Sequence, residues 1–140
     1  MAYVITGATG HIGNNLAKSL IQNNKEVVIL TRKIDDAIKG LDAKIIIGDI
    51  FEDSFLDNNI REKDIVIHLA GVIDIKNNKK DETYKINYEG TKKLINICIH
   101  KNIERFIYFS SVDCIYKEGD EKVVEPVEIF ADKFSDNYSH

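Results

Sequence analysis

Three glycines near the N-terminus have a spacing that could hold a phosphate group. Gly7, Gly10 and Gly13 follow directly after the apolar run Tyr3–Ile5, where we expect a strand to end and a helix to begin. In such a turn the first glycine allows a sharp bend, the second leaves room for a pyrophosphate, and the third lets the helix pack closely on the sheet. Unpaired N–H groups at the helix N-terminus then attract the phosphates. The glycines predict a dinucleotide-binding turn.

Two other interpretations of this turn can be weighed against the first. A triphosphate-binding loop is excluded, because no Gly-Lys-Ser or Gly-Lys-Thr follows the glycines. A glycine-rich turn without a ligand remains an alternative, since the spacing by itself is weak evidence. The position of the glycines between a strand and a helix favours the binding turn.

The residues about 20 positions after the glycines bear on the choice of cofactor. An NAD site usually has Asp or Glu there to bind the ribose 2′-hydroxyl. Here Arg32 and Lys33 follow the apolar run Val27–Leu30, and their charges suit the 2′-phosphate of NADP, although Arg can also stack on adenine. Asp35 or Asp36 as a displaced acceptor keeps NAD possible, and solvated surface charges are the remaining alternative. The pattern favours NADP over NAD.

The elements that must position these residues alternate between strand-length apolar runs and segments of helical period. The runs are continuously apolar, as in strands covered by helices on both faces. We therefore expect an α/β fold, a Rossmann-type doubly wound parallel sheet that stops after about the fifth strand. The predicted strands are Tyr3–Ile5, Val27–Leu30, Lys44–Ile47, Ile65–Leu69 and Phe106–Phe109.

Two longer helices are predicted. The first carries Ile12, Leu16 and Leu20 on one face and ends at Asn23–Asn24. The second runs from about Glu82 to His100, and its Gly90 costs about 1 kcal/mol relative to Ala, so we expect a packing reason for it. Its apolar face is predicted to contain Tyr84, Tyr88, Thr91, Ile95 and Cys98. Shorter helical turns are expected at Asp35–Ile38 and Ser54–Ile60.

Length and composition limit the class of protein. The 140 residues, 44% of them apolar, fit one globular domain. No run could span a bilayer and no signal peptide precedes the first strand, so we expect a cytoplasmic protein without membrane contact. Cys98 and Cys114 have neither redox nor metal-ligand spacing, and no metal is expected. The only basic cluster, Lys76–Lys80, suits a solvated loop better than a nucleic-acid site.

Further motifs resemble the extended short-chain dehydrogenase/reductases. Gly48-Asp49-Ile50 matches the family's adenine-contacting segment, and His68-Leu69-Ala70-Gly71 matches a strand end that lines the cofactor. Asn87, followed by Gly90-Thr91, matches the long helix. The resemblance implies NAD(P)-linked hydride transfer. The position of His68 on an apolar strand predicts a buried structural residue, and the resemblance does not make it catalytic. The implied cofactor-binding residues are Gly7, Thr9, Gly10, His11, Ile12, Gly13, Arg32, Asp49, Ile50, Leu69, Ala70, Gly71 and Asn87. His11 is otherwise an exposed residue at the start of the helix.

The catalytic residues implied by the resemblance are Ser111 and Tyr138. In the family's epimerases a Ser or Thr precedes a Tyr by four residues, but counting back from Tyr116 reaches Val112. The Ser110-Ser111-Val112 order is closer to the reductase branch, with Ser111 favoured and Ser110 second. Two serines that bond the backbone at a strand end are the alternative. Tyr138 resembles the family's proton-exchanging Tyr, and the lysine that lowers its pKa would fall beyond residue 140.

Residues 1–116 are thus predicted to form an NAD(P)-binding domain. Residues 117–140, rich in charge and containing the only proline, are expected to form a loop toward Tyr138, with the rest of the domain and the substrate-binding part missing. We expect these 140 residues alone to be inactive, and an exposed apolar flank to favour self-association or instability.

Three functions remain open, and none of them specifies the small-molecule substrate. The first is part of a reductase-like oxidoreductase that transfers hydride at a carbonyl or alcohol carbon. The second is part of an NAD-dependent nucleotide-sugar epimerase or dehydratase. The third is a dinucleotide sensor without catalysis.

Overall fold

Five parallel strands form one sheet in the order β3-β2-β1-β4-β5. The computed structural model describes residues 1–73 and 80–111. The strands are β1 (Tyr3–Thr6), β2 (Val27–Thr31), β3 (Lys44–Ile47), β4 (Ile65–His68) and β5 (Arg105–Tyr108). Each predicted strand is confirmed to within one residue at either end, and the predicted doubly wound α/β class is confirmed as well.

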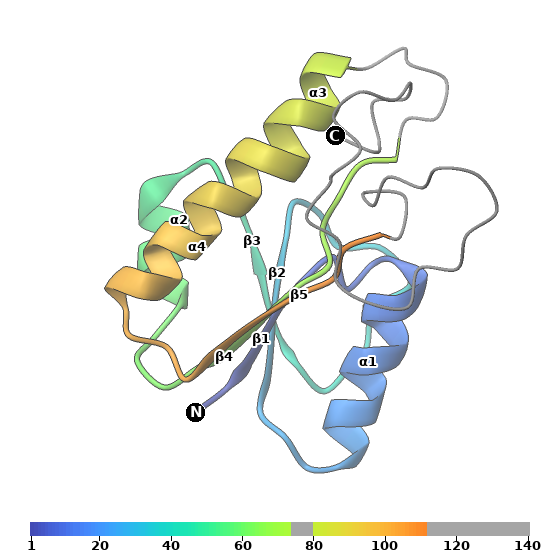
Figure 1. Cartoon of the computed structure of the whole chain (residues 1–140). Helices are drawn as coiled ribbons and strands as arrows, with labels where there is room; N and C mark the ends of the chain where they lie inside the picture. The colour runs from blue at the N-terminus through green and yellow to red at the C-terminus, as the bar shows by residue number, and fades with distance from the viewer. Residues whose placement is uncertain (74–79, 112–140) are drawn as a thin grey trace, which may run out of the picture.

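Helices cover both faces of this sheet (Figure 1). Helix α1 lies against one face, and α2 and α4 lie against the other. The helical elements are α1 (His11–Gln22), α2 (Asp53–Asn59), α3 (Lys80–Tyr84), the π-helical segment η1 (Lys85–Gly90) and α4 (Thr91–His100). The segment predicted as helical at Asp35–Ile38 is a hydrogen-bonded turn, in which the Lys39 N–H donates to the Asp35 carbonyl over 3.0 Å.

The alternation of side chains along the strands explains the two cores. Val4 stands beside Val28 and Val66 on the neighbouring strands, and all three belong to the core beneath α2 and α4. Ile5, the next residue, belongs with Ile29 and other apolar residues to the core beneath α1. Because both rows are almost completely buried, the strands read as continuous apolar runs.

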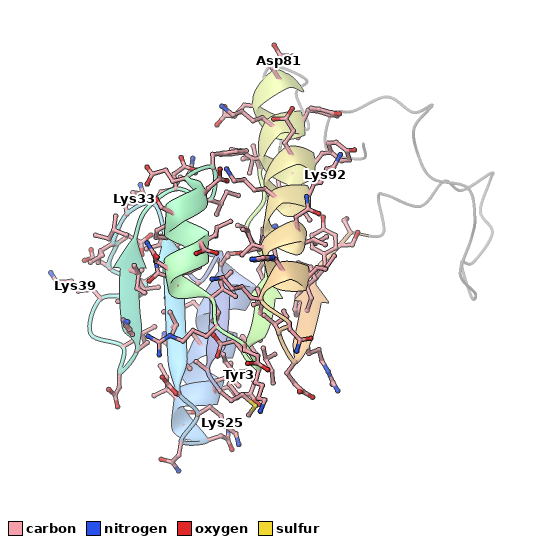
Figure 2. All side chains as sticks on the ribbon, turned by 90° about the vertical axis from the view of Figure 1, so that its left-hand side faces the viewer. Tyr3, Lys25, Lys33, Lys39, Asp81 and Lys92 are labelled. Atoms are coloured by element: carbon pink, nitrogen blue, oxygen red, sulfur yellow. The ribbon has the colours of Figure 1, made fainter. Side chains whose placement is uncertain are left out.

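The carboxyl ends of the strands lie at one edge of the sheet. Lys25, which precedes β2, and Lys33, which follows it, mark opposite ends of the sheet in Figure 2, and Asp81 lies beyond the edge marked by Lys33. The chain runs outward from β1 to β2 and β3 and then returns to place β4 on the other side of β1. Ligands of open α/β sheets bind at such a switch point, outside the carboxyl ends.

The predicted long helix is present over residues 80–100, but its predicted face is partly wrong. Tyr84 and Tyr88 are 54% and 49% exposed, whereas Leu94 is buried and Cys98 lies beside it. Apolar residues occur on two sides of this helix, so the period alone did not decide between them. The π-helical segment was also not predicted, because nothing in the local composition marks it.

Cys98 is a packing residue, as predicted. It is a free thiol 3% exposed, and burial raises its pKa to about 12. A thiol with so high a pKa is unreactive at neutral pH. Cys114, the basic cluster from residue 76 to 79 and the predicted boundary at residue 116 lie outside the described residues.

Candidate functional site

Two of the three turn glycines are required by the fold itself. Gly7 has φ +78°, and a β-carbon there would lie 2.6 Å from the Ala70 backbone nitrogen. A β-carbon on Gly13 would lie 2.3 Å from the Gly7 carbonyl oxygen. The turn after β1 is therefore pressed between the backbone after β4 and the first turn of α1. Residue 13 must be glycine because its α-carbon lies against the backbone of this turn, and not because the helix packs on the sheet there.

Gly10 is different, because the fold does not explain it. Its φ of −78° and ψ of 165° are open to any residue. A β-carbon on Gly10 would meet only the Gly7 carbonyl oxygen, at the ordinary contact distance of 3.4 Å. Gly10 is the N-cap of α1, where no side chain caps the helix and no acidic residue occupies the first turn. The open space above this residue fits an anion that approaches the helix N-terminus.

Two cavities meet at this turn. One has a volume of about 410 Å³ and the other about 840 Å³, and both are lined by Gly7, Gly10 and the segment Leu69–Gly71. These shared residues follow β1 and β4, on either side of the switch point. A ligand with two ends joined by a pyrophosphate would fit this arrangement, with one end in each cavity.

Every residue predicted to bind the dinucleotide lines at least one of these cavities. The first cavity has Thr9, Arg32, Asp49 and Ile50 in its wall in addition to the shared residues. The second has His11, Ile12, Gly13 and Asn87. The structure therefore brings together positions that lie as far apart in the sequence as Gly7 and Asn87, while their roles in binding remain proposals.

Arg32 directly follows β2 and borders the first cavity. It is exposed, and Lys33, Asp35 and Asp36 are not among the described residues that line this cavity. The Asp35 carboxylate instead accepts the Ala37 N–H over 2.9 Å. The cavity wall at this point thus carries a guanidinium and no carboxylate from the segment after β2.

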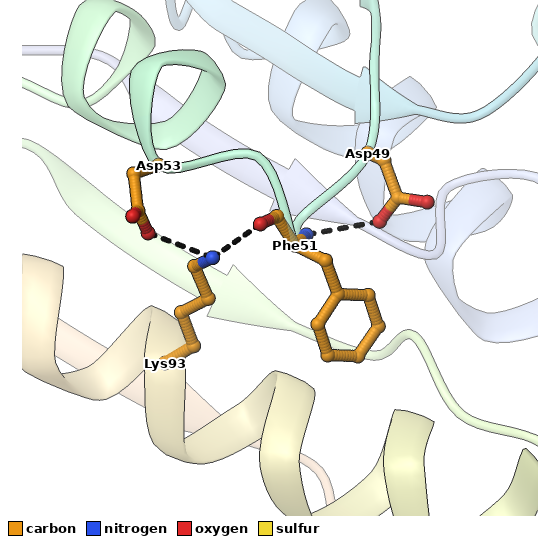
Figure 3. Close-up of polar contacts among 4 residues, drawn as sticks. All are labelled: Asp49, Phe51, Asp53 and Lys93. Carbon is orange, nitrogen blue, oxygen red and sulfur yellow. Dashed lines mark hydrogen bonds and ion pairs between the residues drawn. The ribbon is translucent and has the colours of Figure 1, made fainter.

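The segment after β3 forms another wall of the first cavity. The Asp49 carboxylate accepts the Phe51 N–H over 2.9 Å, which fixes the turn between them (Figure 3). Ile50 packs on the long helix, because a β-carbon on Gly90 would lie 2.6 Å from the Ile50 Cδ1 atom. The packing reason expected for Gly90 is therefore confirmed. Sequence reasoning missed Phe51, whose type alone gives no signal of a binding role.

His68 is a buried structural residue, as predicted. It is fully buried, and its Nδ1 and Nε2 atoms lie 2.6 Å and 2.9 Å from the hydroxyl oxygens of Thr6 and Thr91. Burial lowers its pKa from 6.5 to about 4, so the ring is neutral at pH 7. A neutral imidazole has one donor and one acceptor, and the two hydroxyls satisfy both. His68 thereby joins β1, β4 and α4.

Asn87 acts on the segment after β4. Its side-chain oxygen accepts the Val72 N–H over 2.8 Å, and its amide nitrogen donates to the Val72 carbonyl over 2.9 Å. It extends from the π-helical segment η1. Val72 lines the first cavity and Asn87 the second, so these two hydrogen bonds join the walls of the two cavities, a role that the sequence motif did not indicate.

Ser111 lines the second cavity, together with Ser110. The favoured catalytic serine thus lines the same cavity as the predicted cofactor residues Ile12 and Asn87. Tyr138, Val112 and Tyr116 lie outside the described residues. The cavity also contains Tyr88, Lys92 and Asn96 from the long helix, which sequence reasoning did not assign to the site.

Two other kinds of site are not found within residues 1–73 and 80–111. No group of three or more His, Cys, Asp or Glu side chains there could hold a metal ion. None of the helices in this part of the chain is both long and apolar enough to cross a membrane.

Known proteins resemble the chain over nearly its whole length. The model of the 3-beta hydroxysteroid dehydrogenase/isomerase family matches residues 4–140. The UDP-glucose 4-epimerase of Haemophilus influenzae is 32% identical over 137 residues, which cover 89% of this chain and 40% of that protein. The chain spans between 34% and 40% of the length of the curated relatives that it matches.

Solved structures agree with the fold, and some of them contain NAD. An epimerase from Methanothermobacter thermautotrophicus superposes with a TM-score of 0.85 at 23% identity, covering 99% of this chain and 43% of that one. A UDP-glucuronic acid 4-epimerase from Bacillus cereus, solved with NAD and a fluorinated UDP-glucuronic acid, has a TM-score of 0.75 at 26% identity. It covers 89% of this chain and 44% of that one.

Proposed function

Since the chain belongs to the 3-beta hydroxysteroid dehydrogenase/isomerase family of extended short-chain dehydrogenase/reductases, we propose that it is the dinucleotide-binding part of an NAD(P)-dependent enzyme. The observation that carries this proposal is Gly10. The fold accounts for Gly7 and Gly13, but the missing side chain at Gly10 leaves open the point where the two cavities meet. A pyrophosphate at the start of α1 gives that space a function.

The adenosine half belongs in the first cavity and the nicotinamide half in the second. This orientation follows from Arg32 and Asp49, which border the first cavity, and from Ser111, which borders the second. When bound, the dinucleotide supplies hydride transfer at a carbon that carries an OH or C=O group. The Ser111 hydroxyl orients the substrate oxygen, and Tyr138 exchanges the proton.

The choice between NAD and NADP rests on two opposed observations. Arg32 borders the first cavity without a carboxylate from the segment after β2, which supports NADP. The similar epimerase from Bacillus cereus was solved with NAD, which supports NAD. We retain NADP as the proposal from the geometry, and a direct comparison of the two affinities decides it.

For the complete enzyme, a nucleotide-sugar epimerase is the better supported activity. Curated and structural relatives include UDP-glucose and UDP-glucuronic acid epimerases. The serine pattern favoured a reductase, but these relatives favour an epimerase. The reductase stays as the second candidate, because Val112 stands where epimerases of the family have Ser or Thr. The family model that matches the chain also describes a hydroxysteroid dehydrogenase.

The experiment that tests the binding proposal is isothermal titration calorimetry of the 140-residue chain with NAD and NADP. Saturable one-to-one binding of either dinucleotide is expected. ADP-ribose should compete with it, because that molecule keeps the adenosine half and the pyrophosphate. A folded chain that binds none of the three would overturn the proposal.

Activity is tested separately, on a protein extended to the length of the curated relatives. Interconversion of a UDP-hexose without added reductant would support the epimerase, and consumption of NADPH with a carbonyl substrate would support the reductase. A protein that binds the dinucleotide and catalyses neither reaction would support the third function, a dinucleotide sensor without catalysis.

A further inference from the structure

Lys93 connects the long helix to the segment that lines the first cavity. It lies in α4, and its ammonium group donates to the Phe51 carbonyl and pairs with the Asp53 carboxylate at 2.7 Å (Figure 3). Its side chain is 25% exposed. Phe51 lies between β3 and α2, and Asp53 is the first residue of α2, so one lysine joins the long helix to a separate part of the fold.

The backbone of Phe51 is held at both of its polar groups. Its N–H donates to the Asp49 carboxylate, and its carbonyl accepts from Lys93. Figure 3 shows these contacts in one line from Asp49 through Phe51 to Lys93, with the second Asp49 carboxylate oxygen pointing away from Phe51. A displacement of Phe51 would therefore also move Asp49.

The long helix contacts this loop at two more places, both in its π-helical segment η1. Ile50 packs against Gly90, and the Lys85 ammonium lies 5.0 Å from the centre of the Phe51 ring. Asp49, Ile50, Phe51 and Lys85 all line the first cavity, whereas Lys93 is not among the described residues that do so. Any effect of Lys93 on a ligand there must pass through the loop.

We propose that Lys93 is a positioning residue, which holds the segment Asp49–Phe51 in the conformation that receives the adenosine half of the dinucleotide. This inference rests on the proposed function. The decisive contact is the one with the Phe51 carbonyl, because a charged donor makes a stronger hydrogen bond than a neutral one. The ion pair with Asp53 contributes less, because that carboxylate is 86% exposed and screened by water.

A second lysine provides a matched control. Lys101, directly after α4, pairs with Asp57 of α2 at 2.8 Å, and its side chain is 24% exposed. Both lysines therefore join the same two helices, with similar distance and exposure. Asp57 lies further along α2, away from the segment Asp49–Phe51. Replacing Lys101 therefore removes one positive charge and one ion pair between the helices without removing a contact to the loop.

The experiment compares dinucleotide affinity among four variants by calorimetry: Lys93→Met, Lys93→Arg, Asp53→Asn and Lys101→Met. We expect Lys93→Met to weaken binding of the preferred dinucleotide about five- to tenfold, which is less than the full effect of a hydrogen bond to a charged group, because Lys93 acts on the ligand only through the loop. The other three variants should stay within about twofold of the wild type. Circular dichroism checks that each is folded, and Lys93→Gln replaces Lys93→Met if the latter is not.

Binding of partial ligands distinguishes positioning from general destabilisation. Lys93→Met should weaken ADP-ribose by the same factor as the dinucleotide and leave nicotinamide mononucleotide, followed by NMR titration, unchanged. Equal affinities of wild type and Lys93→Met would overturn the inference, as would an equal loss in Lys101→Met or Asp53→Asn. A wild-type chain that binds no dinucleotide overturns the proposed function as well, so the two failures are distinguishable.

Discussion

A β-carbon on Gly13 would stand 2.3 Å from the carbonyl oxygen of Gly7, which is closer than two such atoms can come. The first turn of α1 thus fits against the end of β1 only when residue 13 is glycine. Gly10, between them, has room for a side chain. Within this one short turn, the fold requires glycine at positions 7 and 13, whereas only a ligand would require it at position 10.

Gly13→Ala should destabilise the protein, although Gly→Ala inside a helix ordinarily stabilises by about 1 kcal/mol. The clash with backbone atoms outweighs helix propensity, and we expect the free energy of unfolding to fall by about 1–3 kcal/mol in urea titrations. Gly10→Ser is the control, because serine is a favoured N-cap and should stay within about 0.5 kcal/mol of the wild type. Equal stabilities of Gly13→Ala and wild type would contradict the packing described for this turn.

Acid should destabilise the fold through His68. Its pKa is about 4 in the folded protein against 6.5 for the free side chain, so the unfolded state binds the proton first. Its contribution to stability is fully present above pH 6.5 and is lost as the pH falls toward 4, by about 2 kcal/mol when pH 5 is reached. Urea unfolding between about pH 7.5 and 5 measures this slope. His68→Gln, which cannot titrate, should remove most of it, and an unchanged slope would assign it to other groups.

Arg32→Ala should weaken NADP more than NAD. A hydrogen bond to a charged group contributes about 1.5–3 kcal/mol, so the affinity for NADP should fall by roughly tenfold or more relative to any change in the affinity for NAD. Lys33→Ala removes the same charge from the neighbouring position, which is not among the described residues that line the cavity, and should change both affinities little. Calorimetry with both dinucleotides decides the matter. Equal losses for NAD and NADP in Arg32→Ala would mean that Arg32 only stacks on adenine.

Asn87→Ala should loosen the segment after β4. It removes both hydrogen bonds to the Val72 backbone, and we expect a loss of about 1–3 kcal/mol in the free energy of unfolding. Dinucleotide affinity should fall too, because the neighbouring segment Leu69–Gly71 borders both cavities. Asn96→Ala is the control for the free energy of unfolding, since Asn96 is an exposed residue of the same long helix. If Asn87→Ala and Asn96→Ala change the free energy of unfolding equally, the hydrogen bonds from Asn87 to Val72 do not hold the segment after β4.

The sequence predicted most of the architecture because local patterns determine it. The five apolar runs became the five strands, and the alternation of Val4 and Ile5 between two cores explains why no period of two was visible. The face of the long helix was predicted less well. Its apolar residues lie on two sides, and the choice depends on Ile50 packing against Gly90, a contact between residues 40 positions apart.

The site shows the same division. Glycine spacing indicated the position of the turn, but it could not show that Gly13 is needed by the fold and Gly10 is not. Asn87 was recognised by its motif, while its partner Val72 and the π-helical segment that contains it became visible only in the structure. Lys93 gave no signal in the sequence, because a lysine on a helix is usually a solvated charge. Such roles depend on which backbone groups tertiary packing brings within reach.

Calorimetry of Gly10→Val decides whether a dinucleotide lies across the turn at Gly10. We expect this variant to keep its circular dichroism spectrum, because a β-carbon at this position meets only the Gly7 carbonyl oxygen at 3.4 Å. Binding of NAD, NADP and ADP-ribose should be lost, because the side chain fills the space that the pyrophosphate needs. If a folded Gly10→Val binds these ligands as tightly as the wild type, no pyrophosphate lies at this turn.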